Sequence, residues 1–311
     1  MTRVLVTGGA GYLGSVLVGH LLRRGYQVTV VDNLLYRQAG LLQYCCESGF
    51  DFVRGDVRDQ SLMRKLIADH DILVPLAALV GMPACARDPV AATSVNLDAV
   101  LMLNRLRSRE QRVVFPCTNS GYGAKSGEMY CTEETPLEPI SLYGTTKVDA
   151  EKALLDSPNT VTLRLATVFG VSARMRLDLL VNDFTYRAVT DRYLVLYEKD
   201  FKRNYLHIED VAGAFCHALE HFDEMEGEPY NVRLDAANLS KEQLALKIKA
   251  FVPQLLIQAA AIGTDPDQRN YVVSNEKIKK KGFEASHTLE EGIQQLLTCF
   301  RMLPPGPFAN V

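Results

Sequence analysis

Tyr143 and Lys147 stand four residues apart in the segment Leu142-Tyr-Gly-Thr-Thr-Lys147. On a helix, residues four apart share one face, so the phenol and the ammonium come together. A tyrosine with a pKa of about 10 is a poor base near neutral pH, but a neighbouring ammonium favours the phenolate and lowers that pKa. The spacing therefore predicts a general base, Tyr143, tuned by Lys147. The alternative is an exposed Tyr/Lys pair without function, which is common on any helix.

Three further polar side chains follow an apolar strand expected over residues 112–116. They are Thr118, Asn119 and Ser120, in the segment Thr118-Asn-Ser-Gly-Tyr-Gly123. Hydroxyl and amide groups at the end of a buried strand cost free energy unless something pairs with them, and a bound ligand is one such partner. We therefore expect Asn119 and Ser120 among the residues that contact a substrate.

A glycine-rich turn near the N-terminus is suited to binding a dinucleotide. Gly8, Gly11 and Gly14 separate an apolar strand at 4–6 from an amphipathic helix. Such a turn lets a pyrophosphate approach bare backbone at the helix N-terminus, where unpaired N–H groups favour an anion. Three glycines are equally compatible with an ordinary turn. The residues that follow must therefore distinguish a dinucleotide-binding turn from an ordinary one.

The next strand, expected at 27–31, ends in an acid that distinguishes the two nicotinamide cofactors. Asp32 comes 18 residues after Gly14. A carboxylate at this place accepts a hydrogen bond from the ribose 2′-OH of NAD and repels the 2′-phosphate of NADP. Strand, helix and acid together predict an NAD site.

Other cofactor contacts are expected where later strands end, because doubly wound sheets bind ligands at the carboxyl ends of their strands. Asp56 would contact the adenine or serve as a turn or cap residue instead. Ala77 and Ala78 would leave room for the cofactor, unless they are a close-packed pair. The residues predicted to bind NAD are Gly8, Gly11, Tyr12, Leu13, Asp32, Asn33, Asp56, Val57, Leu76, Ala77, Ala78, Tyr143, Lys147 and Thr167.

Strands and helices alternate through the first half of the chain, which predicts an α/β fold of Rossmann type, a doubly wound parallel sheet with helices on both faces. Further strands are expected at 50–53, 71–78 and 161–166, and helices at 60–68, 89–108, 211–220, 241–250 and 289–300. Asp59 and Ser240 are expected to cap the helices at 60–68 and 241–250. Pro75 should lie near the end of its strand, because it has no N–H for a sheet ladder. Asn96, among apolar neighbours, is interpreted as a satisfied buried amide.

The alternation breaks down after about residue 170, where a helix-rich stretch at 172–190 begins. This predicts a smaller, interleaved second domain. We assign residues 1–168, with 201–222 returning to them, to an NAD-binding domain, and residues 169–200 and 223–311 to a substrate-binding domain.

Composition limits the partners of the protein. Its 34 basic and 37 acidic residues leave a net charge of -3, which argues against nucleic acid or an anionic membrane as the main partner. The longest apolar stretch, 72–82, is too short to span a bilayer. The seven cysteines and six histidines lack metal-ligand spacing, so we expect reduced thiols and no metal. The first strand begins almost at Met1, and we expect a cytoplasmic protein.

The whole chain resembles the extended short-chain dehydrogenases/reductases of the NAD-dependent epimerase/dehydratase family, which act on nucleotide-linked sugars. The motifs occur in that family's order and spacing: Thr118-x-x-x-Tyr122-Gly123, Tyr143-x-x-x-Lys147, Arg164-Leu-Ala-Thr-Val-Phe-Gly170 and Arg203-Asn-Tyr-Leu-His-Ile-Glu-Asp210. Segments 75–81, 118–123 and 174–186 are similar in particular to bacterial GDP-glycero-manno-heptose 4-dehydrogenases. The resemblance implies a nucleotide-sugar substrate and a homodimer formed through two helices of the first domain.

The resemblance also implies a role for each catalytic residue. Tyr143 resembles the catalytic base, and Lys147 the group that binds the nicotinamide ribose and tunes that base. Thr118 matches the Ser/Thr that hydrogen-bonds the reacting hydroxyl. These assignments extend the interpretation drawn from the spacing alone.

Four more residues are expected to bind the substrate. Arg203 matches a basic residue that clasps the diphosphate in this family. Arg269 is a second phosphate ligand by resemblance, although the family's usual Arg-Pro-Gly-Asp form is missing here. Arg174 and Asn182 complete the set, together with Asn119 and Ser120.

Departures from the family pattern narrow the reaction. The 4,6-dehydratase branch has Thr-Asp-Glu after its strand, whereas this chain has Thr118-Asn119-Ser120, so elimination of water is not expected. The leading hypothesis is NAD-dependent oxidation of the C4 hydroxyl of a nucleotide-linked sugar, a GDP-heptose by resemblance, to a 4-keto sugar. A 4-epimerase is the alternative, and a catalytically silent NAD-binding protein is a third hypothesis that the complete set of Thr118, Tyr143 and Lys147 disfavours.

Overall fold

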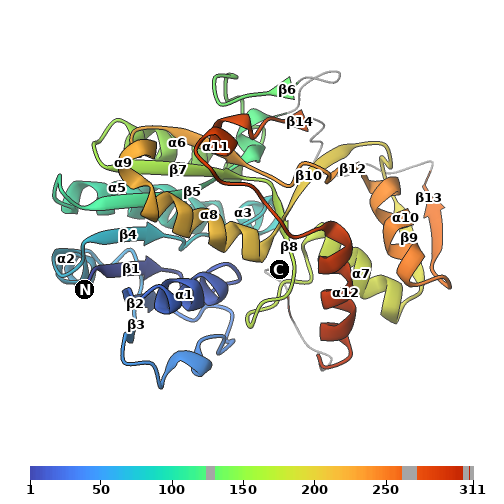
Figure 1. The fold of residues 1–311 in the computed structure, drawn as a ribbon, viewed down its shortest axis with the longest axis horizontal. Coiled ribbons are helices and arrows are strands. Elements are labelled where there is room, and N and C mark those ends of the chain that lie inside the picture. The colour runs from blue at the N-terminus through green and yellow to red at the C-terminus, as the bar shows by residue number, and fades with distance from the viewer. Residues whose placement is uncertain (124–129, 261–271, 304–307, 309–311) are drawn as a thin grey trace.

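A seven-stranded sheet forms the centre of the larger lobe (Figure 1). The computed structural model describes residues 1–123, 130–260, 272–303 and 308. All strands of this sheet run parallel, in the order β11-β7-β5-β4-β1-β2-β3, as a doubly wound fold requires. The bounds are β1 Arg3–Thr7, β2 Gln27–Asp32, β3 Phe50–Arg54, β4 Ile72–Pro75, β5 Arg112–Thr118, β7 Thr160–Leu165 and β11 Pro229–Val232. The predicted fold class is confirmed.

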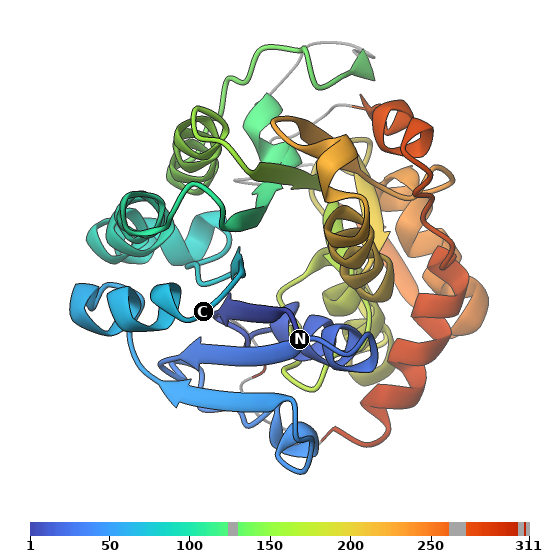
Figure 2. The ribbon, with the colours of Figure 1, turned by 60° about the vertical axis from the view of Figure 1, so that its left-hand side comes forward.

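Helices cover both faces of this sheet (Figures 1 and 2). Two of them, α1 (Gly14–Arg23) and α8 (Ile208–Glu220), pack side by side on one face. The other face is covered by α2 (Gln60–Ala68), α5 (Ala99–Leu106) and α6 (Leu142–Leu155). The helix at 60–68 begins after Asp59, whose side chain accepts from the N–H groups of the first turn, as the sequence predicts.

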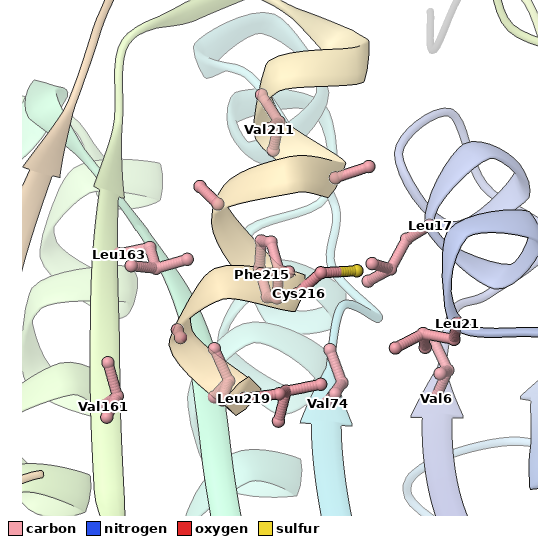
Figure 3. Close-up of a cluster of buried hydrophobic side chains, with 14 of the residues drawn as sticks. Val6, Leu17, Leu21, Val74, Val161, Leu163, Val211, Phe215, Cys216 and Leu219 are labelled. Carbon is pink, nitrogen blue, oxygen red and sulfur yellow. The ribbon is translucent and has the colours of Figure 1, made fainter. Parts of the chain in front are cut away.

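Alternate residues of each strand supply the two cores, because successive side chains point to opposite faces. Val6 of β1 belongs to the cluster beneath α1 and α8, while its neighbour Leu5 belongs to the cluster beneath α2, α5 and α6. Figure 3 shows the first cluster, in which Phe215 of α8 lies over the strands and Cys216 points toward Leu17 of α1. Full burial of each such side chain contributes about 1.5–3 kcal/mol.

The strand order reverses at β1, which has β2 on one side and β4 on the other. The carboxyl ends of these three strands point toward the smaller lobe (Figure 1). In open parallel sheets this is the crevice where ligands bind. Pro75 is the last residue of β4, as expected, so its missing N–H leaves no gap inside the ladder.

The smaller lobe is built around α7 (Leu180–Thr190), α10 (Lys241–Phe251) and α12 (Leu289–Phe300), whose buried faces share one apolar cluster. Ser240 and Thr288 start α10 and α12 with capping boxes.

The remaining elements belong to both lobes. They are η1 Leu42–Tyr44, α3 Met82–Arg87, α4 Pro89–Thr93, η2 Ser94–Asp98, η3 Asn119–Tyr122, β6 Tyr130–Cys131, β8 Thr167–Phe169, β9 Tyr193–Leu196, β10 Lys202–His207, α9 Phe222–Met225, β12 Asn238–Ser240, β13 Leu256–Ala259, β14 Val272–Val273 and α11 Glu276–Lys280.

The structure departs from the sequence-based expectations in two helices. The helix expected at 89–108 is interrupted by a five-residue π-helical segment, η2, between α4 and α5. The stretch at 172–190 is helical only from Leu180, since the residues before it form the loop that joins β8 to α7. Within the described part of the chain, no helix is both long and apolar enough to cross a membrane.

Two strands pair differently from the expected division into domains. β11 (Pro229–Val232) adds to the edge of the large sheet beside β7, although residues 223–311 were assigned to the second domain. β10 pairs with β8 and β12 in a separate three-stranded sheet, although 201–222 were assigned to the first domain. The apolar residues of a four- to six-residue strand indicate that the strand is buried, but they do not indicate which other strand it pairs with.

Candidate active site

A cavity of about 570 Å³ lies at the carboxyl ends of β1, β2 and β4 and extends to the second lobe. It brings together nearly all the residues that the sequence singles out. Those that line it are Gly8, Gly11, Tyr12, Leu13, Asp32, Asn33, Asp56, Val57, Leu76, Ala77, Ala78, Thr118, Ser120, Tyr143, Lys147, Thr167, Arg174 and Arg203. Asn119 and Asn182 do not line it, and Arg269 lies outside the described residues.

The turn after β1 fits closely against the end of β4. Gly8 has a φ of +68°, and a Cβ there would lie 2.6 Å from the backbone of Ala77. Only glycine meets both conditions, since other residues rarely adopt this φ and would clash. The Gly8 N–H donates to the Val31 carbonyl at 2.8 Å, which joins the turn to the end of β2 as well. The turn therefore sits at the reversal point of the sheet, where a pyrophosphate would reach the first turn of α1.

Asp32 ends β2 at the edge of the cavity. Its carboxylate accepts from the N–H groups of Ala10 at 3.0 Å and Leu34 at 2.8 Å, which fixes its orientation. Burial raises the pKa of Asp32, and these two hydrogen bonds oppose the rise. Asp56, at the end of β3, lines the cavity and also forms a turn with Arg58, whose side-chain hydrogen bond lowers the pKa of Asp56. The two alternatives considered for Asp56 are thus compatible.

Helix α6 presents Tyr143 and Lys147 to the cavity on one face, as their spacing predicts. Ser141 starts the helix by accepting from the Gly144 N–H at 3.1 Å. The Lys147 side chain is buried, and its ammonium lies 3.8 Å from the ring centre of Phe115. Burial lowers the pKa of Lys147 to about 8.

The surroundings of Lys147 fit a bound dinucleotide. Among the described residues, its ammonium has neither a hydrogen bond nor an ion pair, although the side chain is only 4% exposed. A buried charge without a partner costs free energy, and ribose hydroxyls at this place would satisfy it. Asp32 and the glycine turn supply the contacts that the other half of a dinucleotide needs. The residues present therefore fit NAD.

Thr118 is the last residue of β5 and caps the short 3₁₀ helix that follows it. Its Oγ1 donates to the Ser120 hydroxyl at 3.0 Å and accepts from the Ser120 N–H at 3.1 Å. Thr118 and Ser120 thus face the cavity together. Asn119, predicted to contact substrate, is 3% exposed and does not line the cavity. Its amide has no hydrogen bond to the described residues.

Behind Lys147, a buried ion pair joins α6 to β7. Arg164 contacts Glu151 at 2.9 Å, and both side chains are nearly inaccessible. Arg164 also donates to the Tyr122 hydroxyl at 3.1 Å. The sequence interpretation did not assign Glu151 a role, although a carboxylate one turn after Lys147 on a helix expected to pack inward is a signal for such a pair. The network fixes the position of the helix that presents Lys147.

Arginines of the second lobe approach the cavity from the opposite side. Arg203 of β10 is buried and lines it. Arg174 lies in the loop between β8 and α7, with its guanidinium 4.0 Å from the ring centre of Tyr36. Arg176, in the same loop, forms an ion pair with Asp178. The second lobe thus brings two buried arginines, Arg174 and Arg203, to the wall of the cavity.

Asn182, predicted as a substrate ligand, is instead part of the junction between the lobes. It is fully buried in the first turn of α7. Its Oδ1 accepts from the Gly170 N–H at 3.1 Å, and its Nδ2 donates to the Arg176 carbonyl at 2.8 Å and to the Tyr12 hydroxyl at 3.2 Å. Because these contacts use both ends of the amide and the side chain is fully buried, a substrate in the cavity does not reach Asn182.

Comparison with known proteins identifies the family. The model described as "NAD dependent epimerase/dehydratase family" matches residues 4–232. The chain belongs to this family. Among curated proteins it is similar to the low-salt glycan biosynthesis protein Agl12 of Haloferax volcanii, with 28% identity over 94% of this chain and 96% of that protein. NAD is therefore the cofactor, as predicted from Asp32 and the glycine turn.

Solved structures agree with this assignment. The UDP-glucose 4-epimerase of Thermotoga maritima, determined with UDP-glucose, superposes with a TM-score of 0.84 at 25% identity, covering 97% of this chain and 99% of that one. The UDP-glucose 4-epimerase of Thermus thermophilus, determined with NAD, gives 0.82 at 26% identity over 96% and 99%. A nucleotide-sugar enzyme of the epimerase/dehydratase type is the functional class that the family shows.

Proposed function

We propose that this protein oxidises the C4 hydroxyl of a nucleotide-linked sugar to a ketone, with NAD as the hydride acceptor. The observation that supports the proposal most directly is the shared cavity of Thr118, Tyr143 and Lys147 with the dinucleotide turn and Asp32. A non-catalytic NAD-binding protein would need the turn and Asp32 but not a hydroxyl, a phenol and a buried ammonium at the far end of the same cavity.

In this reaction Tyr143 accepts the proton of the C4 hydroxyl as the C4 hydride leaves, so that the products are a ketone, NADH and a proton. Lys147, with a pKa of about 8, is mostly protonated at neutral pH, and its charge favours the Tyr143 phenolate. The Thr118 hydroxyl holds the reacting oxygen by a hydrogen bond. General base catalysis of this kind contributes about 10²–10⁴-fold to the rate.

The side chains around Thr118 disfavour loss of water. Elimination across C5 and C6 needs a base for the C5 proton and an acid for the departing hydroxyl. Asn119 does not line the cavity, and neither its amide nor the Ser120 hydroxyl ionises near neutral pH. Four carboxylates line the described cavity. Asp32 and Asp56 follow β2 and β3 on the cofactor side, where Asp32 accepts from backbone N–H groups and Asp56 is paired with Arg58. Asp178 is paired with Arg176, and Asp183 with Arg187. The expected product therefore keeps its 6-hydroxyl.

A GDP-heptose is the substrate that we favour, and Arg203 is the residue that we expect to clasp its diphosphate. The proposal for the sugar rests on the likeness of segments 75–81, 118–123 and 174–186 to GDP-heptose 4-dehydrogenases. The proposal for Arg203 rests on a buried arginine in the cavity wall of the second lobe, because a planar guanidinium matches phosphate geometry.

A second candidate is a nucleotide-sugar 4-epimerase, which performs the same oxidation and then returns the hydride to the other face of the sugar. Two of the similar structures, those from Thermotoga maritima and Thermus thermophilus, are UDP-glucose 4-epimerases, which supports this alternative. The two differ in whether the keto sugar leaves the cavity.

Mass spectrometry of sugar nucleotides after incubation with enzyme and NAD separates these reactions. The panel contains GDP-heptoses, GDP-mannose, UDP-glucose and dTDP-glucose, each with and without a 2-keto acid as a second oxidant. We expect loss of two hydrogens from a GDP-linked sugar, with NADH formed or reoxidised. A C4 epimer without a trapped ketone would establish the epimerase instead, and a dehydrated 6-deoxy product would overturn both.

A further inference from the structure

Arg174 is a buried arginine whose charge the described residues leave largely unmatched. Its side chain is 2% exposed, and its Nε and Nη2 atoms have no hydrogen-bond partner among the described residues. Its aromatic contact with Tyr36 covers one face of the guanidinium and leaves the edge, where the N–H groups are, for another ligand. A guanidinium that is buried without hydrogen bonds costs free energy, so a bound anion is expected at this edge.

The surroundings of Arg174 belong to the cofactor half of the cavity. Tyr36 comes four residues after Asp32, in the segment that follows β2. Asp32 and Arg174 are close enough for each to shift the pKa of the other. The backbone of Arg174 lies against the same segment, since a Cβ at Gly40 would be 3.2 Å from the Arg174 nitrogen. The side chains of Asp32, Tyr36 and Arg174 thus lie together where the adenosine ribose and the phosphates of NAD are expected.

The loop that contains Arg174 is fastened to the dinucleotide turn. The Ser172 hydroxyl donates to the Tyr12 carbonyl at 2.7 Å and lies 2.7 Å from the Ser15 hydroxyl. The Tyr12 hydroxyl in turn donates to the Gly170 carbonyl at 2.7 Å. These buried contacts hold Gly170 and Ser172 against the N-terminal end of α1. Arg174, two residues after Ser172, therefore lies beside the cofactor half of the cavity.

We infer that Arg174 is a ligand of the NAD diphosphate, and that Arg174 and Tyr36 together close over the adenosine half of the cofactor and slow its release. This assignment differs from the expectation that Arg174 binds the substrate. It rests on NAD as the cofactor and not on the identity of the sugar. An arginine fork binds phosphate oxygens through parallel N–H donors, and its stack on Tyr36 keeps the fork oriented.

The test measures cofactor binding in the absence of sugar. NADH affinity and dissociation rate are followed by fluorescence for the wild type, Arg174→Lys and, as a matched control, Arg203→Lys. We expect Arg174→Lys to weaken NADH binding roughly 10- to 100-fold and to speed its release, because a lysine lacks the fork and the stack. Arg203→Lys should leave NADH affinity unchanged and raise the substrate KM.

Two further measurements locate the contact. ADP-ribose, which contains the diphosphate but no nicotinamide, should lose as much affinity as NADH in Arg174→Lys. Tyr36→Leu should weaken NADH binding several-fold, whereas Tyr36→Phe, which keeps the aromatic face, should bind as the wild type does. Circular dichroism and thermal unfolding verify that each variant is folded.

The opposite pattern would overturn the inference. If Arg174→Lys is folded and binds NADH and ADP-ribose as tightly as the wild type does, Arg174 is not a cofactor ligand. A raised substrate KM in that variant would return it to the substrate site. Because these titrations contain no sugar, their outcome is independent of which reaction the enzyme catalyses.

Discussion

Lys147 shows how much the environment of a single residue determines. The same side chain on the surface would be an ordinary lysine, but burial beside Phe115 lowers its pKa to about 8. The ammonium is retained at neutral pH at a cost in stability, which is typical of groups whose charge serves a ligand or a reaction. The consequence is a specific dependence of stability on pH.

Replacement of Lys147 by methionine should remove that dependence. Between the folded pKa of about 8 and the ordinary value of 10.5, the unfolded chain binds more protons than the folded chain, so the free energy of unfolding rises with pH. The wild type should therefore gain about 3 kcal/mol relative to Lys147→Met as the pH increases through this window. Urea unfolding of the cofactor-free protein at a series of pH values measures the difference. Lys152→Met, on the exposed side of α6, is the control and should show no such gain.

Tyr143→Phe tests the base directly. The substitution keeps the ring and removes the hydroxyl, so NADH affinity should stay within about twofold while turnover falls by about 10²–10⁴-fold. Steady-state turnover together with NADH titration makes this comparison. Tyr193→Phe, on an exposed strand of the second lobe, is the matched control and should retain full activity. Near-normal turnover in Tyr143→Phe would show that Tyr143 is not the general base.

At the scale of elements, the π-helical segment η2 connects the helix layer to the cavity wall. Its wider turn points Asn96 at Leu79, where Oδ1 accepts from the Leu79 N–H at 2.8 Å and Nδ2 donates to the Leu79 carbonyl at 3.0 Å. The expectation of a satisfied buried amide is confirmed. Leu79 lines the cavity just after Ala77 and Ala78, so the irregular turn holds the loop that follows β4. Such π-segments often occur at functional sites.

Asn96→Ala should therefore loosen the cavity as well as the fold. It leaves the Leu79 N–H without a partner and leaves the Leu79 carbonyl only the weak thiol donor of Cys85, which costs about 1–3 kcal/mol in the free energy of unfolding. It should also weaken NADH binding. Denaturant unfolding and NADH titration report the two effects. Asn104→Ala is the control, because Asn104 of α5 donates to the Ala153 carbonyl and the Ser157 hydroxyl, far from the cavity wall. Loss of stability with unchanged NADH affinity would mean that Asn96 serves the fold alone.

The elements that the sequence predicts well are those whose signals are local. The N-caps at Asp59 and Ser240 and the strand end at Pro75 each depend on a few neighbouring residues. The glycine turn and Asp32 are also local, because one βαβ unit contains both. The parallel sheet follows from the alternation of such units.

The parts of the site that the sequence does not predict depend on contacts between distant segments. Asn182 is a polar residue in a helix with several others, and only the packing of the second lobe against Tyr12 makes it a structural amide. The sequence indicates that Arg174 binds an anion, but it does not show whether that anion belongs to the substrate or to the cofactor. The answer depends on the loop that places Arg174 against Tyr36. The extra residue of η2 leaves no periodic signal, since apolar positions recur on both sides of it.

For the whole molecule, the junction between the two lobes determines how well the cavity is held. The loop after β8 and the first turn of α7 meet the dinucleotide turn through buried hydrogen bonds of Tyr12, Ser172 and Asn182. None of these bonds is within one lobe's own secondary structure. Cofactor affinity and global stability should consequently depend on the same contacts, because the turn that receives the cofactor is also the surface on which the second lobe rests.

Asn182→Ala tests this coupling. The change leaves the Gly170 N–H and the Arg176 carbonyl without their partner, and the Tyr12 hydroxyl keeps only its hydrogen bond to the Gly170 carbonyl. It should lower the free energy of unfolding by about 3 kcal/mol. NADH should bind more weakly, because Tyr12 and the loop after β8 lose their attachment. Thr190→Ala, at the exposed end of α7, is the control and should change neither quantity. If Asn182 only contacted the substrate, its replacement would leave the melting temperature unchanged and raise the substrate KM. That result would return Asn182 to the substrate ligands. It would also show that cofactor binding does not depend on the junction between the lobes.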